Sequence, residues 1–192
     1  MKKLFYSFII LSSCIYLQAC KQDNSNIEIV AKNFGGEYTL VNQDNIEVTD
    51  KDFENKYRLI YFGFTFCPAI CPTELQRIST ILNKLPEDIA NKITPIFITI
   101  DPQRDTVQAM KSYVDLFHPR MVGLTGTQAQ IDVVKDGYKI YAAKVKDDTM
   151  TEYTMDHSSF IYFMGPENTL YKIFKMDDST DYMIEQIQNY IQ

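Results

Sequence analysis

The sequence predicts an α/β fold in which a mixed central sheet is flanked by helices on both faces. Short apolar runs rich in β-branched residues alternate with segments whose apolar residues recur every three or four positions. Near each end of the domain, two such runs are separated only by turn residues, which predicts an N-terminal hairpin and a second hairpin inserted before the last helix. The chain has 192 residues, a length that fits one domain with its own core.

The most apolar strand runs directly into a helix, and two cysteines lie at the junction. Residues Leu59 to Phe66 form an almost unbroken apolar and aromatic run, which is typical of a strand buried on both faces. From Thr73 the apolar residues keep helical spacing until Pro86 ends the helix. Cys67 and Cys71 are therefore expected at the N-terminus of that helix.

The other elements follow the same two patterns. We expect the first hairpin at Glu37–Val41 and Ile46–Val48 and a second buried strand at Ile93–Ile100. The next helix is expected to be capped by Asp105, and its apolar stripe is Val107, Met110, Val114 and Phe117. After it we expect a strand at Met121–Leu124, a helix at Thr127–Tyr138, a strand at Lys139–Val145 and an exposed acidic loop to Asp156. The chain then forms a hairpin of Ser158–Met164 and Thr169–Met176 and a final helix from Ser179, with Tyr182, Ile184, Ile187 and Ile191 on its inner side.

The two thiols are placed for chemistry. Four residues apart at a helix N-terminus, Cys67 and Cys71 can share one metal ion or form a disulfide, and the helix dipole favours their thiolate forms. A purely structural disulfide is an alternative, although a disulfide that closes so short a loop adds little stability. A dithiol at this place is the thioredoxin-like arrangement, but the spacing is C-x-x-x-C instead of C-x-x-C.

The N-terminus predicts export and attachment to a membrane. Lys2 and Lys3 precede an apolar run and the sequence Gln-Ala-Cys, so residues 1–20 read as a secretory or lipoprotein signal with Cys20 as lipid acceptor, or as an uncleaved anchor. Cys14 lies inside that apolar run and has no expected chemistry. Residues 21–33 read as a flexible tether and residues 34–192 as the domain. The net charge of −6, with no basic run, argues against nucleic acid as a partner.

The chain has two histidines, and one of them is a candidate third ligand. His118 precedes a proline at a helix end, where an imidazole commonly caps carbonyl groups. His157 enters a predicted strand at the edge where it can face the cysteine loop, although a satisfied surface or core histidine stays open. Two thiolates and one imidazole suit Cu(I), and tolerate Cu(II), better than they suit structural zinc with its four protein ligands.

The chain resembles the Sco/SenC family of copper-handling proteins with a thioredoxin-like fold. The resemblance is carried by YFGFTFCPAICPTEL at 61–75, ITIDPQRDT at 98–106, VGLTGT at 122–127 and DHSSFIYFMGP at 156–166, which fall in order along the domain. It implies that the cysteines of the CPxxCP motif and the histidine of the DH motif, here Cys67, Cys71 and His157, bind one copper ion. Asp101 matches the Asp-Pro of the family and is expected either as an acceptor behind the ligands or as a loop cap. Ala69 replaces the acidic residue common after the first Cys-Pro, which changes the charge near the site.

The resemblance implies a copper chaperone, tethered to the bacterial inner membrane and facing the periplasm, that helps load the CuA site of cytochrome c oxidase. The alternative is a thiol-disulfide oxidoreductase that keeps the oxidase's CuA cysteines reduced, with Cys67 and Cys71 as the redox pair. A peroxiredoxin-like peroxidase is disfavoured, because the threonine expected three residues before the reactive cysteine is Phe64 or Pro68 here.

Overall fold

The computed structural model describes residues 28–146 and 152–191. Its centre is a mixed sheet in the order β2-β1-β5-β4-β3-β8-β9. The strands of this sheet are β1 (Thr39–Asn42), β2 (Glu47–Thr49), β3 (Tyr57–Gly63), β4 (Ile93–Thr99), β5 (Val122–Thr125), β8 (Ile161–Met164) and β9 (Leu170–Phe174). β3, β4 and β5 run parallel, and β1, β2, β8 and β9 are joined to their neighbours by antiparallel pairing. The predicted mixed sheet and both predicted hairpins are confirmed.

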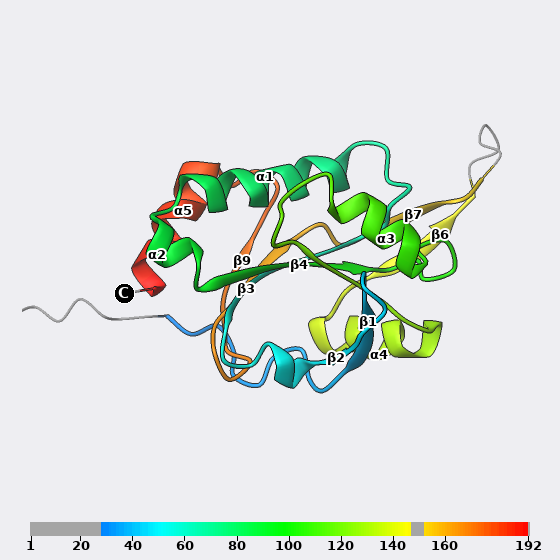
Figure 1. Ribbon diagram of the computed structural model, residues 1–192, viewed down its shortest axis with the longest axis horizontal. Helices are drawn as coiled ribbons and strands as arrows, with labels where there is room; N and C mark the ends of the chain where they lie inside the picture. The colour runs from blue at the N-terminus through cyan, green and yellow to red at the C-terminus, as the bar shows by residue number, and fades with distance from the viewer. Residues whose placement is uncertain (1–27, 147–151, 192) are drawn as a thin grey trace, which may run out of the picture.

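Helices cover both faces of this sheet (Figure 1). The helices α1 (Ile70–Lys84), α3 (Val107–Val114) and α5 (Thr180–Tyr190) lie on one face, and α4 (Gln128–Tyr138) lies on the other. The short helix α2 (Glu87–Ala90) and the 3-10 turn η1 (Asp50–Asp52) were not anticipated from the sequence. The three-layer order gives a thioredoxin-like α/β fold.

β3 is the centre of the core. Every residue from Arg58 to Gly63 is buried, and the strand pairs with β4 on one side and β8 on the other. Its apolar side chains therefore face helices on both sides, as the unbroken apolar run predicts. The strand ends at Gly63, and the chain then passes through a short loop into α1, which fixes the cysteine loop to the most rigid part of the fold.

α1 begins at Ile70, so Cys71 lies in its first turn as predicted, and Pro72 is tolerated there. Three local predictions are wrong, each for a physical reason. Thr106, not Asp105, caps α3 by accepting from the Ala109 N–H at 3.3 Å. His118 caps no helix, since α3 ends at Val114 and the His118 ring accepts from the Arg120 N–H at 3.2 Å.

The third concerns the strand predicted at Lys139–Val145 and the loop after it. β6 (Ala142–Val145) stays outside the central sheet and pairs with β7 (Thr154–His157) in a separate two-stranded ribbon. The end of the predicted acidic loop is therefore a strand, and His157 is its last residue.

The buried side of α5 also differs in part from the prediction. Met183, Ile187 and Tyr190 are buried, whereas Tyr182 and Ile184 are only half-buried. At the other end of the described chain, the backbone of Val30 and Ala31 hydrogen-bonds to Leu170 at the start of β9. The last residues of the stretch predicted as a tether thus lie along the edge of the sheet.

Candidate metal centre

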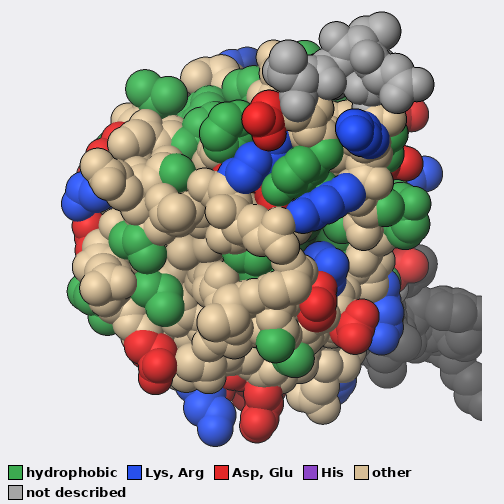
Figure 2. Space-filling view, turned by 90° about the vertical axis from the view of Figure 1, so that its right-hand side faces the viewer, with side chains coloured by type: hydrophobic (Ala, Val, Ile, Leu, Met, Phe, Trp, Pro, Cys, Tyr) green, Lys and Arg blue, Asp and Glu red, His purple; other side chains and the backbone are tan. Residues whose placement is uncertain are grey.

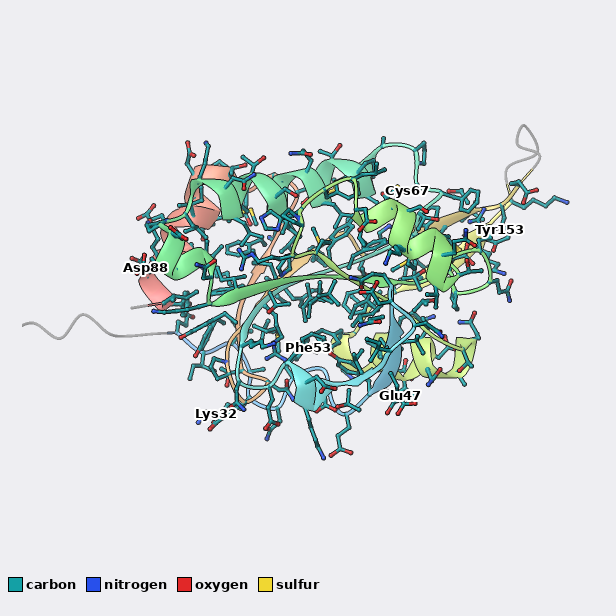
Figure 3. The ribbon with its side chains drawn as sticks, in the orientation of Figure 1. Lys32, Glu47, Phe53, Cys67, Asp88 and Tyr153 are labelled. Atoms are coloured by element: carbon teal, nitrogen blue, oxygen red, sulfur yellow. The ribbon has the colours of Figure 1, made fainter. Side chains whose placement is uncertain are left out.

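Cys67, Cys71 and His157 meet at the end of β3 that leads into α1. Cys67 lies in the connecting loop, Cys71 is the second residue of α1, and His157 reaches the same place from the end of β7. The Cys71 Sγ atom lies 3.8 Å from Nε2 of His157, and the Cys71 N–H donates to the Cys67 sulfur at 3.4 Å. In Figure 3, Cys67 and Tyr153, the residue just before β7, lie toward the same end of the molecule.

Cys67 is poised as a thiolate. Its sulfur accepts hydrogen bonds from the Cys71 thiol and from backbone N–H groups at the start of α1, and these donors lower its pKa to about 5. The side chain is half-buried, so it remains accessible from the loop. The sequence-based expectation that the helix N-terminus favours a thiolate is met at this cysteine.

Cys71 has the opposite character. It is fully buried, and the hydrogen bond that its thiol donates to Cys67, together with burial, raises its pKa above that of a free thiol. The Tyr61 hydroxyl lies 3.8 Å from its sulfur and 3.5 Å from the Ser159 hydroxyl. Both cysteines are free thiols in the structure.

The backbone fixes which nitrogen of His157 faces the thiols. Nδ1 lies 2.9 Å from the Ser158 carbonyl oxygen, which can only accept, so Nδ1 carries the proton. Nε2 is then left with a free lone pair directed at Cys71. The edges of Tyr61 and Phe64 pack against the ring, with centroids 6.4 Å and 5.9 Å away, and hold its plane.

The pair formed by Cys71 and His157 has the spacing of two metal ligands. First-row ions bind thiolate at about 2.3 Å and imidazole at about 2.0 Å, which at a trigonal angle separates sulfur from nitrogen by about 3.7 Å. Within residues 28–146 and 152–191, no three His, Cys, Asp or Glu side chains yet converge on one ion position. Completing a three-ligand set therefore requires the side chains to rearrange, and Cys67 lines an adjoining cavity of about 220 Å³.

Comparison with known proteins decides the family. The sequence model of the SCO1/SenC family matches residues 27–192. This chain belongs to the SCO1/SenC family.

Individual relatives agree with that assignment. An SCO2-like protein of Rickettsia conorii is 41% identical over 160 residues, which cover 81% of this chain and 76% of the relative. The mitochondrial SCO1 homolog 1 of Arabidopsis thaliana is 38% identical over 81% of this chain, which spans only 48% of that longer protein. Among solved structures, copper-bound ScoI of Bradyrhizobium japonicum is 38% identical with a TM-score of 0.74, over 82% of this chain and 99% of that one. Copper-bound ScoI of Arabidopsis thaliana is 35% identical with a TM-score of 0.77, over 82% and 98%.

Asp101 does not contact the candidate ligands of this Sco protein. Its carboxylate accepts from Arg104 Nε at 2.6 Å and from the Tyr153 hydroxyl at 2.8 and 3.0 Å. The backbone carbonyl of Asp101 also accepts from the N–H groups of Arg104 and Asp105. Of the two roles predicted for Asp101, this geometry corresponds to the loop cap.

Arg104 is the residue that sequence reasoning missed. Its guanidinium lies 4.8 Å from the Phe66 ring centroid and 3.8 Å from that of Tyr153, and it donates to the Tyr153 carbonyl at 2.9 Å. It therefore joins the cysteine loop to the strand that carries His157. The only signal in the sequence was its place in the ITIDPQRDT stretch.

A second anchor lies beneath the cysteine loop. The buried carboxylate of Asp105 accepts from the Thr65 N–H at 3.1 Å, the Thr65 hydroxyl at 2.6 Å and the Thr99 hydroxyl at 2.5 Å. This triple contact explains why Asp105 is not free to cap α3. It fixes the backbone immediately before Cys67.

The surface at this end of the molecule combines apolar and cationic side chains (Figure 2). Phe66 is 59% exposed and Ile70 is 44% exposed on either side of Cys67, while Lys144 lies 4.4 Å from the Tyr153 ring centroid. In the described part of the chain, no helix has the length and hydropathy needed to cross a membrane. Cys14 and Cys20 lie outside the described residues.

Proposed function

We propose that this SCO1/SenC protein binds one copper ion through Cys67, Cys71 and His157 and passes it to the CuA site of cytochrome c oxidase. The observation that carries the proposal is the 3.8 Å separation of the Cys71 sulfur and His157 Nε2, with the Cys67 thiolate beside them. Two thiolates and one imidazole make a soft set of few ligands, which suits Cu(I) and tolerates Cu(II). Copper is bound in the related ScoI structures of Arabidopsis and Bradyrhizobium.

The uneven burial of the ligands supports transfer of the ion as well as its binding. Cys71 is fully buried, whereas Cys67 lies in a loop with exposed neighbours. An incoming thiol can displace Cys67 first while Cys71 and His157 still hold copper. Transfer by stepwise ligand exchange therefore needs no opening of the fold.

A second function is favoured by the thiols themselves. A Cys67 pKa of about 5 beside a protonated Cys71 is the asymmetry of a dithiol reductase, in which one thiolate attacks and the other resolves. In that role the protein reduces the cysteines of the oxidase's CuA site. A Sco protein with a described disulfide switch is 21% identical to this chain with a TM-score of 0.64, a likeness that supports the fold alone.

A Cu(I) competition titration of the reduced protein separates the two roles. We expect one tight copper per chain and a loss of affinity of at least about a hundredfold in His157→Ala, because removal of a ligand should cost more than the ten- to a hundredfold loss typical of residues behind the ligands. His118→Gln is the matched control, since it removes the other histidine and should bind copper as the wild type does. Weak copper binding together with rapid disulfide exchange would favour the reductase.

We further propose that the protein is exported and held at the outer face of the bacterial inner membrane through its N-terminus, with a lipid on Cys20. The charged and apolar order of residues 1–20 supports this. An intact-mass spectrum of the membrane-extracted protein should lack residues 1–19 and carry the added lipid mass. A mass that still includes Met1 would argue for an uncleaved anchor.

A further inference from the structure

The cavity beside the candidate ligands is also lined by Met155, a sulfur-containing residue that neither proposed role uses. The residues that line this cavity of about 220 Å³ include Cys67, Met155 and His157. Met155 is half-buried and packs against the hydrophobic core, so its side chain is held at the cavity wall instead of extending into solvent.

The strand places Met155 and His157 on one face. Residues two apart in a β-strand point to the same side, and Met155 and His157 are separated by Asp156 on β7. Asp156 is the one exposed residue of β7, although it also borders the cavity. Across the ribbon, Met155 pairs with Lys144 and His157 with Ala142, which fixes this register. The imidazole and the thioether thus face the cysteine loop together.

The chemistry of the side chain points to Cu(I). Thioether sulfur is a soft, neutral donor that binds Cu(I) and does not compete for protons. The other wall residues between Phe64 and Ile70 are Cys67 itself and apolar side chains. Thr154 and Ser159 offer only hydroxyl groups, and Asp156 offers a carboxylate, which is a hard donor. Met155 is therefore the one further soft donor among the described residues that line this cavity.

We propose that Met155 is an additional copper ligand in this chain, binding Cu(I) through its thioether sulfur beside Cys67, Cys71 and His157. The inference rests on the proposed function, because it supposes that copper enters this site. A neutral fourth donor leaves the charge of the site unchanged and favours Cu(I) over Cu(II). It also keeps the ion coordinated by three groups while Cys67 is exchanged for a thiol of the acceptor.

The test combines affinity with a direct view of the metal–ligand bond. Met155→Leu keeps the volume and apolar character of the side chain, so we expect the fold to be retained. Cu(I) affinity should fall about tenfold, the effect of losing a weak ligand. The Cu(II)/Cu(I) reduction potential should also fall, because the loss of a soft donor weakens the binding of Cu(I) more than that of Cu(II). Met176→Leu is the matched control, because Met176 is 53% exposed and does not line the cavity. Its affinity should equal that of the wild type.

Selenomethionine labelling of the full chain gives the decisive readout. X-ray absorption at the selenium edge should show a copper neighbour in Cu(I)-loaded wild type and in Met176→Leu, and none in Met155→Leu. No copper–selenium contact in the wild type overturns the inference even when Met155→Leu binds copper weakly, since packing alone then explains that loss. Failure of the wild type to bind Cu(I) at all would instead remove the proposed function.

Discussion

A methyl group added at Gly63 tests whether the position of Cys71 controls copper binding. Gly63 is the last residue of β3, and a Cβ atom there would lie 2.7 Å from the Cys71 sulfur, 3.0 Å from Phe97 Cε2 and 3.1 Å from Tyr61 Cε1. Ordinary contacts of this kind are about 3.5–4.0 Å, so the sulfur must move by about 1 Å. Cys71 is fully buried, so the overlap falls inside the core and not at the surface.

The cost of Gly63→Ala follows from this overlap. Overpacking of a core typically destabilises the folded state by about 1–3 kcal/mol. Replacing glycine by alanine also reduces the backbone freedom of the unfolded chain, which stabilises the folded state by about 0.4–1 kcal/mol. A net loss of about 1–2 kcal/mol corresponds to a fall in Tm of about 2–8 °C for a domain of this size. Because the displaced sulfur no longer matches the position of His157, we expect Cu(I) affinity to fall by about ten- to a hundredfold.

The assay needs a variant that is overpacked elsewhere. Gly123→Ala on β5 would bring a Cβ atom to 2.9 Å from Val114 Cγ1 and 3.3 Å from Met110 Cε, so it should lose similar stability and bind copper normally. Thermal unfolding of the reduced apo protein and Cu(I) competition are measured on both variants. Copper affinity in Gly63→Ala equal to that of the wild type would refute the reasoning, and so would an equal loss of affinity in Gly123→Ala.

Two further predictions concern Arg104 and the thiols. Arg104→Gln should lower the free energy of unfolding by about 3 kcal/mol, because the Asp101 carboxylate, only 1% exposed, loses its cationic partner. It should also weaken copper binding, whereas Arg104→Lys should recover part of the stability; unchanged titrations in both variants would exclude Arg104 as the link to His157. Iodoacetamide should label Cys67 of the reduced apo protein with a midpoint near pH 5 and leave Cys71 unlabelled at neutral pH, as read by peptide mass spectrometry. The pKa of Cys67 is lower in the folded protein than that of an unfolded thiol, about 8.5, so the Cys67 thiolate stabilises the fold fully above about pH 8.5, and this stabilisation is lost as the pH falls toward 5. Equal labelling of both cysteines at pH 6 would contradict the low pKa of Cys67.

The strand-to-helix junction could be predicted from the sequence because its signals are local. An unbroken apolar run, helical spacing after it and Pro86 at the end are all contained within one stretch of chain. The approach of His157 to Cys71 is different, since 86 positions separate the two residues. No periodicity encodes that contact; the place of His157 at a predicted strand edge made it a candidate, and the family resemblance then implied the full ligand set.

The missed features depend on tertiary partners. β7 is short and polar and pairs only with β6, outside the central sheet, so it carries no apolar alternation to recognise. Asp105 has the residue type of a helix cap, but the hydroxyls of Thr65 and Thr99 bind its carboxylate first. Arg104 looks like a solvated loop cation until its aromatic neighbours are placed around it.

The pairing of residues 30 and 31 with β9 limits how far the thiols can lie from the membrane if the chain is attached at Cys20. The described chain enters on the left of Figure 1, and Lys32 and Cys67 lie toward opposite ends of the molecule in Figure 3. Ten residues separate Cys20 from Val30, and a chain of that length reaches at most about 35 Å. β3, with 7 residues, adds a span of about 23 Å between the two ends of the sheet. The thiols would then work within a layer on the order of 60 Å above the attachment surface, and any copper acceptor they serve must expose its own ligands within that layer.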